Sequence, residues 1–203
     1  MKYITSMLRK WKNDLLRNLN KPRLFTIAYV ILLNNEAHNL IRKLQIDIFN
    51  QYGMHAGLNA TPHITIKLGI TVNTSELQKL IEYFDNLVSE IEPFEIKMIG
   101  FGYFEEGIVY LDIEQDEILK NIRNKTLEGL QNIFGIKPYP IEGDNYHFHA
   151  TLLHGLPKKY LKNIYKDLTG KFIEFKFVPD TFGILCLLNG RWIVYKKSKL
   201  LYK

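Results

Sequence analysis

The sequence of 203 residues predicts an α+β fold with two pseudo-symmetric lobes, each a mainly antiparallel sheet with helices, facing each other across a central cleft. Two apolar, strand-like segments carry the same His-x-Thr triplet, as His63-Ile64-Thr65 and His149-Ala150-Thr151. Each is followed by a segment with helical hydrophobic spacing and then by further strand-like segments. No Gly-Ser linker separates the two repeats, so we expect the lobes to form one compact unit.

The first repeat begins with an apolar run over residues 23–33, which predicts a buried strand. Asn34-Asn35 predicts a turn before a helix over 36–49, and a loop over 53–60 leads into the first His-x-Thr strand. Thr74 or Ser75 is predicted to cap the next helix. The apolar stripe of that helix is Leu77, Leu80, Ile81, Phe84, Leu87 and Val88.

The second repeat begins with two strands, joined by a turn at Glu105-Glu106-Gly107. A helix over 116–134 and a proline-containing loop over 137–145 precede the second His-x-Thr strand. Beyond that strand the pattern predicts a helix and three strands, the last two joined at Asn189-Gly190. The expected ranges are 94–104 and 108–113 for the first two strands, then 158–168 for the helix and 171–178, 181–188 and 191–197 for the last three strands.

The formal charge of +6 is concentrated at the N-terminus. Residues 1–23 hold seven basic residues and one acidic residue, whereas the rest of the chain holds 20 of each. Residues 1–22 therefore predict a basic amphipathic helix distinct from the domain at 23–203. We expect its apolar stripe to pack on the domain; contact of its basic face with RNA phosphates, a membrane surface or a partner helix are alternatives. The stripe is Ile4, Met7, Leu8, Trp11, Leu15 and Leu19.

Cysteine usage and hydropathy limit the class of protein. The single cysteine, Cys186, excludes an internal disulfide framework and an all-cysteine zinc site, and low cysteine content is typical of the cytoplasm. No apolar run approaches the length of a membrane span. We therefore expect a cytoplasmic protein without a transmembrane segment, and a monomer.

The repeated triplets carry the chemistry. Side chains alternate faces along a strand, so His63 and Thr65 point the same way, as do His149 and Thr151. Each triplet then offers one proton-transfer group and one hydroxyl donor. Two copies would supply an acid, a base and two donors for phosphate oxygens, which is sufficient for phosphodiester chemistry without a metal.

Three further side chains are candidates for substrate binding. Lys67 shares strand parity with His63 and Thr65 and could hold a phosphate; an exposed lysine at the end of a strand is the alternative. Tyr103 or Phe104 could stack on a nucleobase, or each could be an ordinary hairpin aromatic.

The two triplets in their strands, residues 62–66 and 148–152, resemble the paired motifs of the 2H phosphoesterase superfamily, in its 2′-5′ RNA ligase and cyclic phosphodiesterase branch. The glycine–phenylalanine segment over 99–113 is similar to the same branch, and the resemblance covers residues 24–195. It implies a bilobal fold, paired motifs lining a cleft, and neither a metal nor a nucleotide cofactor. One departure is His154, where many members carry a basic residue, often arginine; strand parity places it on the face opposite His149.

The expected reaction is opening of a 2′,3′-cyclic phosphate or a 2′-5′-linked phosphodiester in RNA ends or nucleotides, with ligation as the reverse. One of His63 and His149 would deprotonate water while the other protonates the leaving ribose oxygen, and Thr65 and Thr151 would hold the phosphate. A non-catalytic module that binds RNA or nucleotides is one alternative. The other is a metal-dependent phosphoesterase that uses Asp144, His147, His149 and His154.

Overall fold

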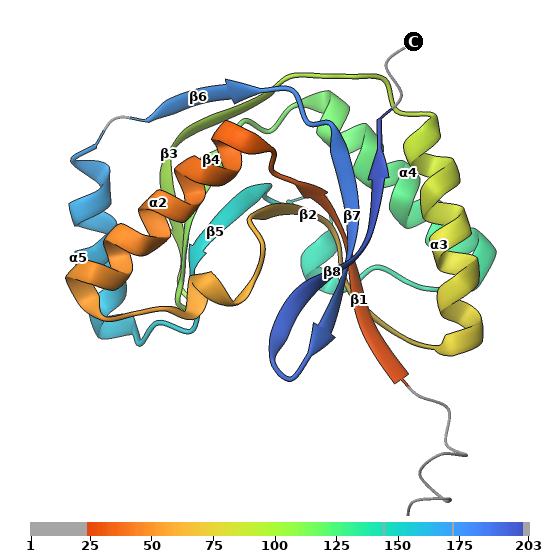
Figure 1. The fold of residues 1–203 in the computed structure, drawn as a ribbon, viewed down its shortest axis with the longest axis horizontal. Helices are drawn as coiled ribbons and strands as arrows, with labels where there is room; N and C mark the ends of the chain where they lie inside the picture. The colour runs from red at the N-terminus through yellow and green to blue at the C-terminus, as the bar shows by residue number, and fades with distance from the viewer. Residues whose placement is uncertain (1–23, 144, 172, 201–203) are drawn as a thin grey trace, which may run out of the picture.

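The computed structural model describes residues 24–143, 145–171 and 173–200 (Figure 1). The predicted amphipathic helix of residues 1–22 lies outside these residues, and so does Asp144 of the alternative metal site. Within the described ranges, no helix is both long and apolar enough to cross a membrane.

The eight strands of the described residues join in one antiparallel sheet, in the order β6-β3-β4-β5-β2-β1-β7-β8. β2, β1, β7 and β8 form one four-stranded half, and β5, β4, β3 and β6 form the other. The two predicted lobes are therefore confirmed, as halves of a continuous sheet that meet between β2 and β5. The strands are β1 (Leu24–Leu32), β2 (His63–Asn73), β3 (Ile96–Phe104), β4 (Ile108–Ile113), β5 (His149–Leu153), β6 (Glu174–Phe177), β7 (Thr181–Leu188) and β8 (Arg191–Lys199).

The helices interlock the two halves. α2 follows β1 of the first half but packs against β5 of the second, and α4 follows β4 of the second half but packs against β2 of the first. α3 covers β1 and β2, and α5 covers β3 and β4, so each half carries two helices (Figure 1). The helices are α2 (Asn35–Tyr52), α3 (Thr74–Ser89), α4 (Glu117–Phe134) and α5 (Lys158–Thr169), with 3-10 turns η1 (Ala56–Asn59) and η2 (Pro140–Glu142).

The N-terminus of α3 differs from the sequence prediction by one residue. Asn73, the last residue of β2, is the N-cap: its side-chain oxygen accepts from the backbone N–H groups of Ser75 and Glu76. Glu76 in turn accepts from the Asn73 N–H, which completes a capping box. The prediction of Thr74 or Ser75 as the cap is wrong because Asn73 supplies the carbonyl that both donors can reach.

β2 is irregular just beyond its triplet. Val30 of β1 pairs with Thr65, but the preceding residue, Tyr29, pairs with Lys67, so β2 holds one extra residue there, Ile66. Such a bulge reverses the faces of the residues that follow it. Thr65 shares the face of Val30, whereas Lys67 shares the face of Tyr29, whose hydroxyl donates to the Leu80 carbonyl of α3.

The two faces of the first half are both packed. The helix side holds most of the buried core, including Ile27, Tyr29 and Ile31 of β1. The opposite side holds a small cluster of Ala28, Val30, Leu32 and Leu185, against which Trp192 and Val194 of β8 pack. This second side is the one on which His63 and Thr65 lie.

Candidate active site

The two triplets meet where the halves join. β2 and β5 run antiparallel and pair through Ile64 and Ala150, the middle residues of the triplets. Both middle side chains are fully buried on the core side, so the residues before and after them point to the other face. One step along this register places His63 level with Thr151. A step the other way places Thr65 level with His149, and such cross-strand neighbours have Cβ atoms about 4.5–5.5 Å apart.

All four of these side chains line a cavity of about 330 Å³. The sequence prediction that both triplets face one cleft therefore agrees with the geometry. Several wall residues were not anticipated: Leu68 from β2, Asn59 from η1 and Trp192 from β8. Among the described residues, the lining of this cavity includes no Lys or Arg side chain.

Both motif imidazoles are held in the same tautomer. Nδ1 of His63 lies 2.7 Å from the Thr61 carbonyl oxygen, and Nδ1 of His149 lies 2.8 Å from the His147 carbonyl oxygen. Because a carbonyl can only accept, each Nδ1 carries the proton. Nε2 of each ring is therefore an acceptor when the imidazole is neutral and a donor when it is charged. The two halves thus present two equivalent groups for proton transfer.

Burial lowers the pKa of both histidines from the ordinary value of 6.5. For His63 the hydrogen bond to Thr61 opposes this effect by favouring the charged ring. For His149 the hydrogen bond to His147 and the negative charge of Asp112 oppose it, while positive charge on His147 or His63 lowers the pKa further. Each imidazole is therefore neutral near pH 7 and ready to act as a base.

Aromatic rings from β3 and β4 surround His149. The ring centroids of Phe104 and Tyr110 lie 5.0 and 5.1 Å from the centroid of its imidazole. Tyr110 reaches this place by lying across Gly102, where a Cβ atom would come within 2.4 Å of its ring. Tyr103, the neighbour of Phe104, instead packs edge-on against Tyr165 of α5 at 4.8 Å. The structure thus brings Phe104 to the site and places Tyr103 away from it; base stacking by either stays a prediction.

Lys67 does not join the site. Because of the bulge at Ile66, its side chain enters the core side of the sheet, where it is buried and its Nζ lies 2.6 Å from Glu142 Oε2. Glu142 also accepts from the backbone N–H groups of Leu68 and Tyr139. The prediction that Lys67 shares the face of His63 is wrong, and so is the alternative of an exposed lysine. Leu68 takes its place in the cavity wall.

α2 anchors the loop that precedes the first triplet. Arg42 donates to the Ala60 carbonyl, and the buried Gln45 donates to the Gly57 carbonyl. Gly57 lies so close to β5 that a Cβ atom would stand 1.8 Å from the Leu152 carbonyl oxygen. Gln45 was not predicted, although a polar residue between Leu44 and Ile48 in an apolar stripe was a signal for a buried polar role.

His154 lines the same cavity as His149, contrary to the parity argument. Parity fails because β5 ends at Leu153 and Gly155 turns the chain with a φ of 70°. His147 instead bonds Asp112, with 2.7 Å between Nε2 and Oδ1. Within the described part of the chain, no group of three or more His, Cys, Asp or Glu side chains is arranged to hold a metal ion.

Paired His-x-Thr strands that face one cavity, in a sheet of two antiparallel halves, define the class of 2H phosphoesterases. The family model described as the 2′-5′ RNA ligase superfamily matches residues 26–191. The chain belongs to this superfamily, which confirms the resemblance seen in its motifs.

Similar proteins agree with this assignment. A Geobacillus thermodenitrificans protein named as a candidate phosphoesterase is 29% identical over 150 residues, which cover 71% of this chain and 81% of that protein. Two solved structures share the fold. TT0787 of Thermus thermophilus has a TM-score of 0.60 at 16% identity, with 86% of this chain and 97% of that chain covered. LigT of E. coli in its apo form has a TM-score of 0.58 at 17% identity, with 89% and 99% covered.

Proposed function

We propose that this protein is a metal-independent phosphoesterase that opens a 2′,3′-cyclic phosphate or a 2′-5′-linked phosphodiester at an RNA end or in a nucleotide. The observation that carries the proposal is the matched pair of imidazoles, each with Nδ1 bonded to a carbonyl and each beside a threonine in the wall of one cavity. Two such groups provide a base and an acid within one site.

In the proposed hydrolysis, the neutral Nε2 of one histidine takes a proton from water as the water oxygen bonds to phosphorus. The bond from phosphorus to one ribose oxygen breaks, and the charged Nε2 of the other histidine gives its proton to that oxygen. The product is a phosphate monoester beside a free hydroxyl. With a ribose 5′-hydroxyl in place of water, the same base would take the proton of that hydroxyl as its oxygen bonds to phosphorus. The acid would protonate the departing 3′-oxygen of the 2′,3′-cyclic phosphate, which leaves a 2′-5′ linkage.

The threonine hydroxyls of Thr65 and Thr151 stabilise the charge that develops on the non-bridging phosphate oxygens. Loss of one such donor costs roughly 10²- to 10³-fold in other enzymes that stabilise an oxyanion. In the antiparallel register of β2 and β5, each histidine lies beside the threonine of its own triplet along the strand. It lies opposite the threonine of the other triplet across the junction. A phosphate between the strands would thus meet both hydroxyls.

Nucleotide complexes of a structural relative support the substrate class. LigT of E. coli has been solved with 3′-AMP, a nucleoside monophosphate, at a TM-score of 0.56 to this chain. A cavity of about 330 Å³ is at the small end of the range for ligand pockets. We therefore propose that the cavity takes the terminal nucleotide and its phosphate.

The test is a product-resolved assay with 2′,3′-cyclic nucleotides, RNA ending in a 2′,3′-cyclic phosphate, 2′-5′-linked dinucleotides and ADP-ribose cyclic phosphate, each with and without EDTA. The variants H63N and H149N should each lower kcat by roughly 10²- to 10⁴-fold. H55N, which changes an exposed histidine outside the cavity lining, should retain wild-type turnover.

Two results would overturn the proposal. Activity that collapses with EDTA and returns with zinc or manganese would show a metal-dependent phosphoesterase. Binding of RNA or nucleotides without turnover of any substrate, unchanged in H63N and H149N, would show a non-catalytic binding module.

A further inference from the structure

The strand pairing of the sheet is shortest between β2 and β5, where the two triplets meet. Within the described residues, β2 and β5 share one aligned pair, Ile64 with Ala150, whereas β1 and β2 share eight. A one-residue ladder offers little resistance to sliding or rotation of one half against the other. Yet proton transfer needs heavy atoms within about 2.6–3.2 Å of their partners. Other contacts must therefore set the relation between the triplets.

Two side-chain hydrogen bonds connect each sequence repeat to the triplet of the other, in addition to the contacts of Glu142 with Lys67 and Leu68. The hydroxyl of Tyr146, three residues before His149, donates to the backbone carbonyl of Thr65 at 2.9 Å. The Nε2 of Gln45, on the helix that precedes the first triplet, donates to the backbone carbonyl of Thr151 at 3.1 Å. Each sequence repeat thus sends one side chain to the threonine of the other repeat's triplet.

Both the nitrogen and the oxygen of the Gln45 amide are hydrogen-bonded. It is 3% exposed, and its Nε2 also donates to the Gly57 carbonyl at 2.9 Å. Its Oε1 accepts from Nη1 of Arg42 at 2.9 Å, which fixes which end of the amide faces the two carbonyls. A buried amide with every partner in place has one orientation, so it ties the loop before His63 to the strand of Thr151.

Tyr146 is held just as firmly. The Arg123 guanidinium lies over its ring at 4.0 Å, and the ring of Phe148 packs against it with 5.2 Å between centroids. Burial raises the pKa of the Tyr146 hydroxyl, so the group stays protonated near neutral pH and can donate to the Thr65 carbonyl.

We propose that Gln45 and Tyr146 are positioning residues that hold the two triplets at their working separation, each by binding the backbone carbonyl of the threonine in the other sequence repeat. Gln45 also borders the cavity, but its amide is already bonded to Arg42, Gly57 and Thr151. The proposal rests on the proposed function because it concerns the spacing of His63 and His149. A displacement of about 1 Å can cost roughly 10²-fold in rate, so each bond should matter more to turnover than to substrate affinity.

The test compares Y146F, Q45M and their double variant with Y83F. Tyr83 is a matched control because its hydroxyl also donates to backbone carbonyls, those of Lys125 and Thr126, but between α3 and α4. Y146F and Q45M should each lower kcat by about 5- to 50-fold with KM within twofold of wild type. Y83F should lose thermal stability to a similar degree and keep wild-type kcat.

A second measurement does not require turnover. Positive charge on His63 lowers the pKa of His149 across the junction, so this pKa, followed by NMR titration, reports on their separation. It should change in Y146F and Q45M and stay at the wild-type value in Y83F. Variants that melt earlier but keep wild-type kcat and the wild-type His149 pKa would overturn the proposal. If the wild-type protein turns over no substrate, the proposed function fails and the titration alone decides the positioning role.

Discussion

In both halves the motif histidine donates from Nδ1 to the carbonyl two residues earlier, but the surroundings of the two imidazoles differ. His149 stands between Phe104 and Tyr110, near the hydrogen bond between Asp112 and His147. For His63, burial and the bond to Thr61 account for the shift in pKa. The backbone therefore fixes the tautomer in both halves, while side chains of the second half adjust the charge of one histidine alone.

A second difference between the two halves lies on the core side of the sheet. Lys67 of the first half forms a buried ion pair with Glu142 of η2, on the core side of the bulge that follows the first triplet. Glu142 also binds the backbone N–H of Leu68, so the pair holds the bulge in shape. The two matching triplets are thus supported by different side-chain contacts, and these contacts can be tested separately.

The largest expected effect comes from breaking the ion pair. K67M leaves the Glu142 carboxylate buried without its cation, which should lower the free energy of unfolding by about 3–5 kcal/mol in chemical denaturation. K176M breaks an exposed pair with Glu95 and should change stability little. The double variant K67M/E142Q should recover part of the loss. A K67M protein as stable as K176M would show that the pair does not hold the bulge.

The pH dependence of kcat/KM follows from the direction of both shifts. One histidine must be neutral and the other charged, and burial lowers both pKa values below 6.5. The bell-shaped profile of the free enzyme should therefore have its maximum below pH 6.5. Binding of an anionic phosphodiester favours the charged rings, so the profile of kcat should lie at higher pH. A maximum above pH 7 in kcat/KM would contradict the assignment.

Charges of opposite sign act on His149 from His63 and Asp112, so removing them should shift the His149 pKa in opposite directions. H63N removes a positive charge and should raise the pKa of His149, whereas D112N removes a negative charge and should lower it. NMR titration of the His149 ring measures both. Shifts of the same sign would show that structural change, rather than charge, dominates.

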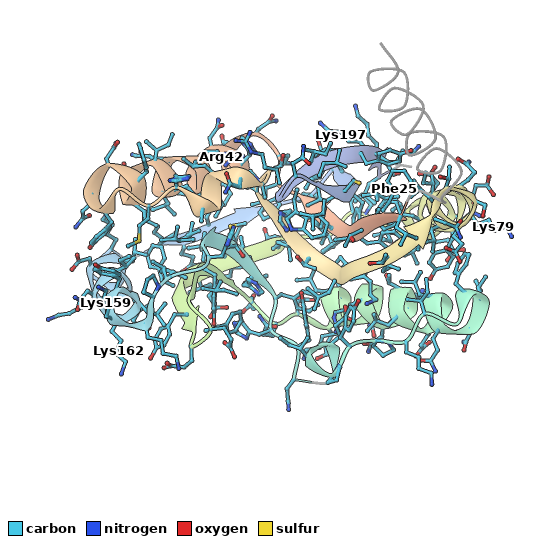
Figure 2. All side chains as sticks on the ribbon, turned by 90° about the horizontal axis from the view of Figure 1, so that it is seen from below. Phe25, Arg42, Lys79, Lys159, Lys162 and Lys197 are labelled. Atoms are coloured by element: carbon cyan, nitrogen blue, oxygen red, sulfur yellow. The ribbon has the colours of Figure 1, made fainter. Side chains whose placement is uncertain are left out.

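The smallest expected effect concerns the helices on the outside of the halves. α5 exposes four lysines that have no acidic partner within ion-pair distance among the described residues, and Figure 2 shows Lys159 and Lys162 at one end of the molecule with Lys79 of α3 at the other. Replacing the α5 lysines by glutamine should weaken binding of RNA oligonucleotides and reduce the salt slope by about 0.7 for each lost phosphate contact. The lysines are Lys158, Lys159, Lys162 and Lys166.

The control for this prediction is K79Q/K125Q, which removes exposed lysines from α3 and α4. Turnover of 2′,3′-cyclic AMP should be unchanged in both sets of variants, because none of these lysines lines the cavity. Equal salt slopes in the two sets would assign the RNA contact elsewhere.

The sequence was sufficient to predict the order of strands and helices, because their hydrophobic periods and turns agree with the fold. It also predicted that His63, Thr65, His149 and Thr151 share a cavity, since one residue of alternation is reliable within a short strand. The same rule failed at Lys67, two residues farther along, because a bulge depends on pairing with β1. At His154 it failed because the strand had already ended.

The residues that join the halves were beyond prediction for another reason. Gln45, Tyr146 and Trp192 reach the site or its supports from elements that no local pattern relates to the triplets. Trp192 comes from β8, whose alternation predicts a strand but not its position in the sheet. Contacts between distant segments follow from topology, and one sequence by itself specifies topology weakly.

The pairing of β1 with β7 has a consequence for how the protein is made. β1 is the first described strand to leave the ribosome, but its second edge stays open until β7 has been synthesised. A nascent chain that already displays both triplets therefore still lacks the strand that completes the first half and the indole of Trp192 that closes the cavity. The complete cavity can form only after residue 192 has been synthesised, and until β7 is present one edge of β1 has no pairing strand.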